Sequence, residues 1–180
     1  MVRNLGDNPL RANSALCPGR GGAASLRGVR RLIASSFGLG LIPRLLWRSD
    51  QGAGTFGAAF GAGIGGLLLV THAGWWAGMA AAAAAIGLSL WSAAPFAEGH
   101  LDPGWVCMDE TAGTLVALVG LSGWPWLAAL ALARAADIWK VLPGVRRAER
   151  LPRSLGVTAD DIVAGLYGLA LGWALKLAGI

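Results

Sequence analysis

Acidic side chains occur as two adjacent pairs in an otherwise apolar chain. Asp109 and Glu110 stand at the mouth of one hydrophobic run, and Asp160 and Asp161 stand at the mouth of another. Neighbouring carboxylates repel each other and resist removal from water, so each pair needs a partner of opposite charge. The search for that partner leads to a third segment of the chain.

Arg134, Asp137 and Lys140 follow one another at intervals of three residues. This spacing places them on one face of a helix. Ionisable residues at membrane depth are costly, and they are usually functional or paired with one another. If the three segments meet, five carboxylates and two cations gather at one face.

A group of this composition suits a hard cation and a phosphate. Oxygen ligands favour Mg²⁺, which binds through one or two carboxylates together with waters and substrate phosphate oxygens. A histidine-based ligand set is excluded, because the chain has only His72 and His100. Arg134 would serve a phosphate as a fork and Lys140 as a point charge. The chemistry that uses these groups together is phosphoryl transfer or phosphate ester hydrolysis.

Simpler interpretations of each acidic segment stay open. Both carboxylate pairs could stabilise helix N-termini, where acids suit the helix dipole. Arg134 and Asp137 could form a structural ion pair. The two cysteines, at positions 17 and 107, form no metal-binding motif or disulfide framework, and we do not expect Cys107 to act as a nucleophile.

Composition indicates an integral membrane protein with helical spans. Of 180 residues, 55% are hydrophobic and only 14% are charged, against about a quarter charged in soluble domains. The apolar residues stand in long blocks rich in Gly and Ala, which suit closely packed transmembrane helices. No polar domain is present to bind nucleic acid, so the net charge of +5 is not read as a nucleic-acid footprint.

The apolar blocks predict an all-α fold with three full spans, at residues 54–74, 75–96 and 161–180. The first two should form a tight hairpin. A fourth run, 111–139, contains Pro125, which breaks or kinks a helix. One straight crossing would put its two ends on opposite sides of the membrane. We favour a broken or re-entrant helical hairpin turning at 122–125, which returns both ends to one face.

The N-terminal part of the chain is basic and poor in apolar periodicity. We expect residues 1–30 to form a flexible basic arm, although an Arg-rich start also resembles a transit peptide. The short apolar piece 32–43 is predicted to be interfacial or re-entrant, and residues 31–180 to form the membrane domain. Five of the fifteen Lys and Arg residues lie at 140–153. Basic stretches beside spans mark the cytoplasmic side, so the charged face is expected there.

Three stretches of the chain resemble the signature regions of the phosphatidylglycerophosphatase A family. They are DPGWVCMDETAG at 102–113, RAADIWKVLP at 134–143 and ADDIVAGLYG at 159–168. FGLGLIP at 37–43 and GTFG at 54–57 resemble the glycine-rich N-terminal motif of that family. The matching positions are Gly54, Thr55, Gly57, Asp102, Asp109, Glu110, Gly113, Arg134, Asp137, Lys140, Pro143, Asp160, Asp161, Ala164 and Gly165.

The resemblance implies a Mg²⁺-dependent lipid phosphatase of the bacterial inner membrane, with its active site facing the cytoplasm. Its substrate would be phosphatidylglycerophosphate and its product phosphatidylglycerol, with no nucleic-acid partner. The implied catalytic residues are Asp109, Glu110, Asp137, Asp160 and Asp161, of which all but Asp137 would hold one or two Mg²⁺ ions. Arg134, Lys140 and Thr55 would bind the substrate phosphate, with Asp102 in support.

The chain departs from the family pattern in two places. Val141 stands where the family usually has proline, and RLLWRSDQGA at 44–53 lengthens the glycine-rich motif. The alternative function is a small membrane transporter or channel that uses the acids as a cation path, because broken helices with buried charges also occur there. Acids gathered at one face argue for the enzyme.

Overall fold

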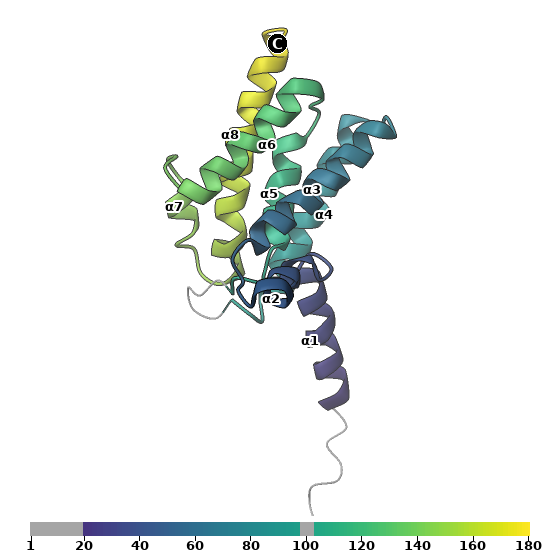
Figure 1. Ribbon diagram of the computed structural model, residues 1–180, viewed down its shortest axis with the longest axis vertical. Coiled ribbons are helices and arrows are strands. Elements are labelled where there is room, and N and C mark those ends of the chain that lie inside the picture. The colour runs from purple at the N-terminus through teal and green to yellow at the C-terminus, as the bar shows by residue number, and fades with distance from the viewer. Residues whose placement is uncertain (1–19, 98–102) are drawn as a thin grey trace, which may run out of the picture.

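The computed structural model describes residues 20–97 and 103–180, and every regular element in these two ranges is helical (Figure 1). Three helices are long and apolar enough to cross a membrane: α3 (Ala53–Val70), α4 (Trp75–Ala93) and α8 (Ser154–Leu177). The bounds of α3 and α4 agree with the predicted spans 54–74 and 75–96 to within a few residues. The third begins seven residues before the predicted start at 161, which changes the position of its two acids.

The fourth apolar run is two helices. α5 (Met108–Leu118) and α6 (Gly123–Trp139) are joined by residues 119–122. Pro125 lies in the first turn of α6, where a missing N–H costs nothing because no carbonyl precedes it in the helix. The chain therefore turns just before the proline, and a single straight helix over 111–139 is excluded.

Helix α5 is the centre of the fold. Ten of its residues are buried and only Glu110 is partly exposed. Helices α3, α4, α6 and α8 all pack against it, and α3 and α4 contact α5 far more than they contact each other. The predicted tight α3–α4 hairpin is thus wrong in its packing, because α5 lies between the two helices and takes up the faces that a hairpin would bury.

Small residues let α5 and α8 cross closely. Gly113 on α5 faces the backbone of Asp161, and Gly165 on α8 faces the backbone carbonyl of Gly113. A side chain at either position would collide with the other helix. This crossing fixes how near the acids of α5 come to those of α8.

The predicted flexible arm is helical in its second part. α1 (Arg20–Ala34) begins ten residues before that arm was expected to end, and residues 1–19 lie outside the described part. Arg30 lies over the ring of Trp91 at 4.7 Å, and Arg31 lies over the ring of Trp105 at 5.5 Å. These cation–π contacts hold α1 against distant segments, which local sequence periodicity does not reveal.

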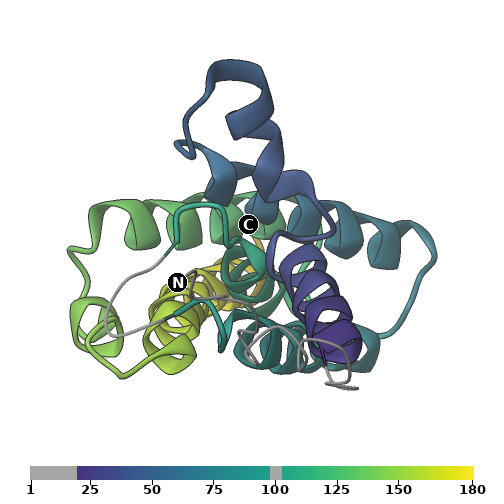
Figure 2. The ribbon, with the colours of Figure 1, turned by 90° about the horizontal axis from the view of Figure 1, so that it is seen from below.

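Three short elements complete the fold. A 3₁₀ turn (Leu39–Leu41) leads into α2 (Ile42–Trp47), which projects from one side of the bundle (Figure 2). These two elements occupy the end of the segment 32–43, predicted as one interfacial piece, and continue into the lengthened motif at 44–53. α7 (Val145–Ala148) lies in the basic stretch between α6 and α8.

Candidate active site

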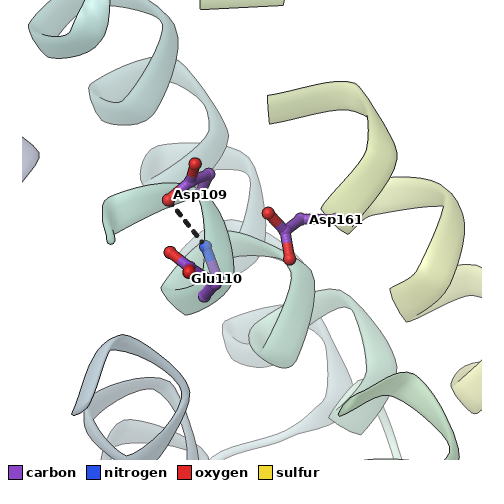
Figure 3. Close-up of side chains that lie close together, drawn as sticks. All are labelled: Asp109, Glu110 and Asp161. Atoms are coloured by element: carbon purple, nitrogen blue, oxygen red, sulfur yellow. Dashed lines mark hydrogen bonds between the residues drawn. The ribbon is translucent and has the colours of Figure 1, made fainter. Parts of the chain in front are cut away.

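Three carboxylates from two helices form a compact group, which we call the acidic cluster. One carboxylate oxygen each from Asp109, Glu110 and Asp161 lies within 4.8 Å of the other two. Figure 3 shows Asp109 and Glu110 on α5 with Asp161 facing them from α8. Asp109 and Asp161 are 2% and 7% exposed, so both charges lie out of bulk water. Buried like charges at this spacing require a compensating cation or shared protons.

The start of α5 is fixed from several sides. The Asp109 carboxylate accepts a hydrogen bond from the backbone N–H of Glu110 at 3.0 Å. Ser36 donates to the carbonyl of Cys107 at 3.0 Å and pairs with the Thr111 hydroxyl at 2.8 Å. The first turn of α5 therefore has little freedom, and the two acids keep their directions.

The two acids of α8 face different neighbours. Both lie about two turns inside the helix, which begins at Ser154, so neither stabilises its N-terminus. This corrects the expectation that the pair opens the last span, and it removes the N-cap interpretation. Successive residues of an α-helix point about 100° apart, since 3.6 residues make one turn. Asp161 accordingly joins the acidic cluster while Asp160 points toward Lys140.

Arg134 lies at the edge of the acidic cluster. Its guanidinium donates to Asp137 at 2.8 Å, one turn along α6, and lies 4.0 Å from the carboxylate of Asp161. Both side chains of the α6 pair are largely buried, at 20% and 15% exposure. An Arg fork held by one carboxylate keeps further N–H groups for a ligand. The structure thus brings Arg134 and Asp137 beside the cluster.

Lys140 connects Asp160 to the basic stretch. Its ammonium donates to Asp160 at 2.9 Å and to Glu149 at 2.7 Å. Burial alone would lower the pKa of Lys140, but the hydrogen bonds and the charges of Glu149 and Asp160 raise that pKa above its usual value. The ammonium therefore stays charged and holds Asp160 away from the acidic cluster.

The glycine-rich motif borders the cluster through Gly54. A side chain at this position would collide with the carboxylate of Glu110 and would lie 3.3 Å from the Arg134 guanidinium. Thr55 is exposed, and its hydroxyl makes no hydrogen bond among the described residues. Asp102 lies outside the described residues, so its predicted supporting role stays a prediction.

Comparison with known families decides what these motifs belong to. The sequence model of the family described as Phosphatidylglycerophosphatase A matches residues 32–176. The chain belongs to this family. The match includes every described residue of the acidic cluster, together with Arg134, Asp137 and Lys140.

Two relatives share part of this sequence. A Bacteroides thetaiotaomicron protein, whose provisional name is phosphatidylinositol-3-phosphatase, is 40% identical over 75 residues, which is 39% of this chain and 46% of that protein. A Haemophilus influenzae protein named Phosphatidylglycerophosphatase A is 33% identical over 81 residues, 43% of this chain and 50% of that protein. The matches cover about half the length of each relative. No solved structure matches the chain.

The donor atoms of this family member fit a divalent cation. The ligand atoms of the acidic cluster are all carboxylate oxygens, the type that Mg²⁺ prefers. One oxygen of Glu110 is buried without a hydrogen-bond partner in the described structure. A buried, unsatisfied carboxylate oxygen is expensive unless a ligand completes it. Asp109, Glu110 and Asp161 could therefore hold the ion, whereas Asp160 is engaged by Lys140.

Sequence reasoning missed several residues that support the site. Ser36 and Thr111 anchor the start of α5, but hydroxyl residues in apolar segments carry no signal of their distant partners. Glu149 holds Lys140, and it could have been singled out as the one acid in the basic stretch 140–153. Cys107 precedes α5 and is fully buried. Burial raises the pKa of its thiol to about 12, which agrees with the expectation that it is no nucleophile.

Proposed function

We propose that the chain is a Mg²⁺-dependent lipid phosphatase that hydrolyses the terminal phosphate of phosphatidylglycerophosphate to give phosphatidylglycerol, a step of phospholipid biosynthesis. The observation that supports this most directly is the acidic cluster with Arg134 at its edge. Family membership supports the same chemistry. Three apolar helices in the same chain suit a substrate that resides in a bilayer.

The reaction adds water to the terminal phosphorus and breaks its ester bond to glycerol, releasing inorganic phosphate and an alcohol. Asp109, Glu110 and Asp161 would hold Mg²⁺, which supplies Lewis acidity toward the phosphate oxygens and the attacking water when bound. Arg134 would bind the phosphoryl oxygens and offset the charge that develops on them. Asp137 orients the guanidinium for that task through its 2.8 Å hydrogen bond.

Lys140 has a different position in this scheme from the one expected of a phosphate ligand. Its ammonium already donates hydrogen bonds to the carboxylates of Glu149 and Asp160. These contacts suit a residue that orients Asp160. Direct phosphate binding by Lys140 and Thr55 stays a prediction. Metal binding by Asp160 also stays a prediction, because the oxygen of that carboxylate that Lys140 does not bind is buried without a partner.

We also propose a place for the enzyme in the cell. Helices α3, α4 and α8 would span the bacterial inner membrane, and α5 with α6 would form a hairpin entering from one side. The basic stretches near α1 and at 140–153 favour the cytoplasm as that side. The membrane domain would comprise residues 31–180, preceded by a basic segment.

The alternative of a cation transporter or channel receives less support. Asp109, Asp160 and Asp161 are the fully buried acids of the described residues, and all three lie where α5, α6 and α8 meet. A transport path would need polar groups distributed across the bilayer. A gathered group beside an arginine fork is better explained by phosphate chemistry.

Phosphate release from phosphatidylglycerophosphate in mixed micelles tests the proposal. The purified protein should release phosphate with Mg²⁺ and stop on addition of EDTA. Asp109→Asn should lower the rate by at least about 1,000-fold, since it removes a buried charge from the proposed metal site. Asp50→Asn is the matched control, because Asp50 pairs with the exposed Arg44 and is not part of the acidic cluster.

Two results would contradict the proposal. One is phosphate release that continues undiminished in EDTA, which would exclude a divalent-cation enzyme. The other is a folded protein that releases no phosphate from phosphatidylglycerophosphate. A monophosphorylated inositol lipid should be assayed in parallel, because one relative is named for that substrate class. Preference for the inositol lipid would move the activity to another lipid phosphate.

A further inference from the structure

A cavity lies between the end of α6 and the stretch that carries α7, and we call it the basic cavity. It has a volume of about 530 Å³, within the range of about 300–1,000 Å³ typical of small-molecule sites. Four cationic residues line it: Lys140, Arg146, Arg147 and Arg150. No carboxylate lines the basic cavity, so its walls carry charge of one sign.

The three arginines lack acidic partners. Among the described residues, no carboxylate oxygen lies within 4.0 Å of Arg146, Arg147 or Arg150, whereas Lys140 binds Glu149 and Asp160. Arg146 and Arg147 lie on α7, Arg150 lies in the turn that follows this helix, and all three line the cavity. Convergent guanidinium groups without counter-charges favour an anionic ligand.

The backbone that carries these arginines is fixed. Val145 and Ala148 of α7 are buried, and they anchor the turn on the side opposite the arginines. The carbonyl of Pro143 accepts a hydrogen bond from the Tyr167 hydroxyl of α8 at 2.9 Å. Gly144 takes a φ of 93°, which lets the chain turn sharply into α7. The arginines therefore stand on a preformed frame.

Apolar groups share the cavity with the cations. Val141, Leu142 and Pro143 also line it, and Val141 is 71% exposed. The end of α6 adds exposed Ile138 and Trp139 next to this rim. An apolar border beside a cationic floor suits a phospholipid, whose charged headgroup adjoins acyl chains, better than it suits free phosphate.

We propose that the basic cavity is a second phosphate site, which binds the phosphodiester of an anionic phospholipid. This inference rests on the proposed function, since phosphatidylglycerophosphate carries a terminal phosphate that is hydrolysed and a diester phosphate that is retained. Lys140 connects the two sites: the residue lines the basic cavity, and its ammonium binds Asp160, the chain neighbour of Asp161 in the acidic cluster. One lipid could thus occupy both sites, and the product keeps the group that the arginines bind.

Equilibrium binding of short-chain phosphatidylglycerol in a neutral detergent tests the site without requiring catalysis. The double variant Arg147→Gln/Arg150→Gln should weaken binding at least about tenfold, because two charge-assisted hydrogen bonds are lost. Arg44→Gln/Arg48→Gln removes the same charge from α2 and the residue that follows it, and should leave binding within about twofold. Asp109→Asn should also keep its affinity, since the acidic cluster does not hold the diester.

Several outcomes would overturn the inference. An equal loss of affinity in both double variants would mean a diffuse surface field with no defined site. Inorganic phosphate that displaces phosphatidylglycerol at similar concentration would make free phosphate the ligand. Unchanged affinity in the Arg147/Arg150 variant would exclude the cavity altogether.

Hydrolysis measured on the same samples tests the proposed function separately. The parent protein could release no phosphate while the Arg147→Gln/Arg150→Gln variant binds phosphatidylglycerol more weakly than the parent. In that case the proposed function fails, but the proposed ligand of the basic cavity stands. If the parent protein hydrolyses phosphatidylglycerophosphate and its affinity for phosphatidylglycerol does not depend on these arginines, the proposed function stands and the proposed ligand of the basic cavity fails. If both hypotheses are correct, the KM for phosphatidylglycerophosphate should rise in the Arg147→Gln/Arg150→Gln variant while kcat changes by less than about threefold.

Discussion

Replacing Gly113 by alanine tests whether the close crossing of α5 and α8 sets the geometry of the acidic cluster. A methyl group at this position would lie 2.5 Å from the carbonyl oxygen of Asp161 and 3.0 Å from its Cβ. Ordinary contact between such atoms requires about 3.5 Å. The two helices must therefore separate by about 1 Å, and the displacement falls on the residue that joins the two halves of the cluster.

The size of the effect follows from this shift. Overpacking a well-packed interior costs about 1–3 kcal/mol of folding free energy. A displacement of about 1 Å in a catalytic group costs about 100-fold in rate. We therefore expect Gly113→Ala to lower kcat for phosphate release about 100-fold, to weaken Mg²⁺ activation and to reduce the unfolding temperature modestly.

The control is the same substitution at Gly63 of α3, where a methyl group meets nothing within 4 Å. Gly63→Ala should keep kcat within about twofold. Circular dichroism in detergent establishes that both variants are folded before activity is compared. A folded Gly113→Ala protein with the parent kcat would refute the reasoning, and so would an equal loss in Gly63→Ala.

Two further predictions concern single side chains. Lys140→Met should cost about 3 kcal/mol of stability, because it leaves the buried carboxylate of Asp160 without its partner. Glu149→Gln should cost under about 1 kcal/mol, because the Glu149 side chain is half exposed. Equal unfolding midpoints of the two variants in urea would contradict this difference. Cys107 should not react with a maleimide at pH 8 until the protein unfolds, because its side chain is fully buried and its pKa of about 12 keeps it a thiol. Mass spectrometry in a Cys17→Ser background measures this, and rapid labelling of folded protein would contradict the burial of the thiol.

The predictable part of the fold is the part that long apolar runs determine. α3 and α4 were located from the sequence because a membrane span needs about 20 consecutive apolar residues. α1 escaped prediction because its arginines are held by aromatic rings far away in the chain. α8 starts early because Ser154 and its neighbours are helical without being apolar enough to mark a span.

The sequence predicted which residues gather at the candidate site, but not which of them contact one another. Adjacent acids look equivalent in a sequence, so Asp160 and Asp161 were both expected to hold one or two Mg²⁺ ions. Helix geometry turns them toward different partners, and only Asp161 reaches Asp109 and Glu110. Lys140 was expected to bind the substrate phosphate, and its contacts with Asp160 and Glu149 were not predicted because they depend on the path of the chain from α6 through α7 to α8.

The central position of α5 has a consequence for how the protein is made. Ribosomes deliver the chain from its N-terminus, so α3 and α4 emerge before the helix on which both pack. Asp161 arrives only with α8, which is synthesised after α3, α4, α5 and α6. Until then the nascent chain has Asp109 and Glu110 without their third carboxylate. The acidic cluster therefore closes only when α8 has been made, and a chain interrupted before α8 contains two of its three carboxylates.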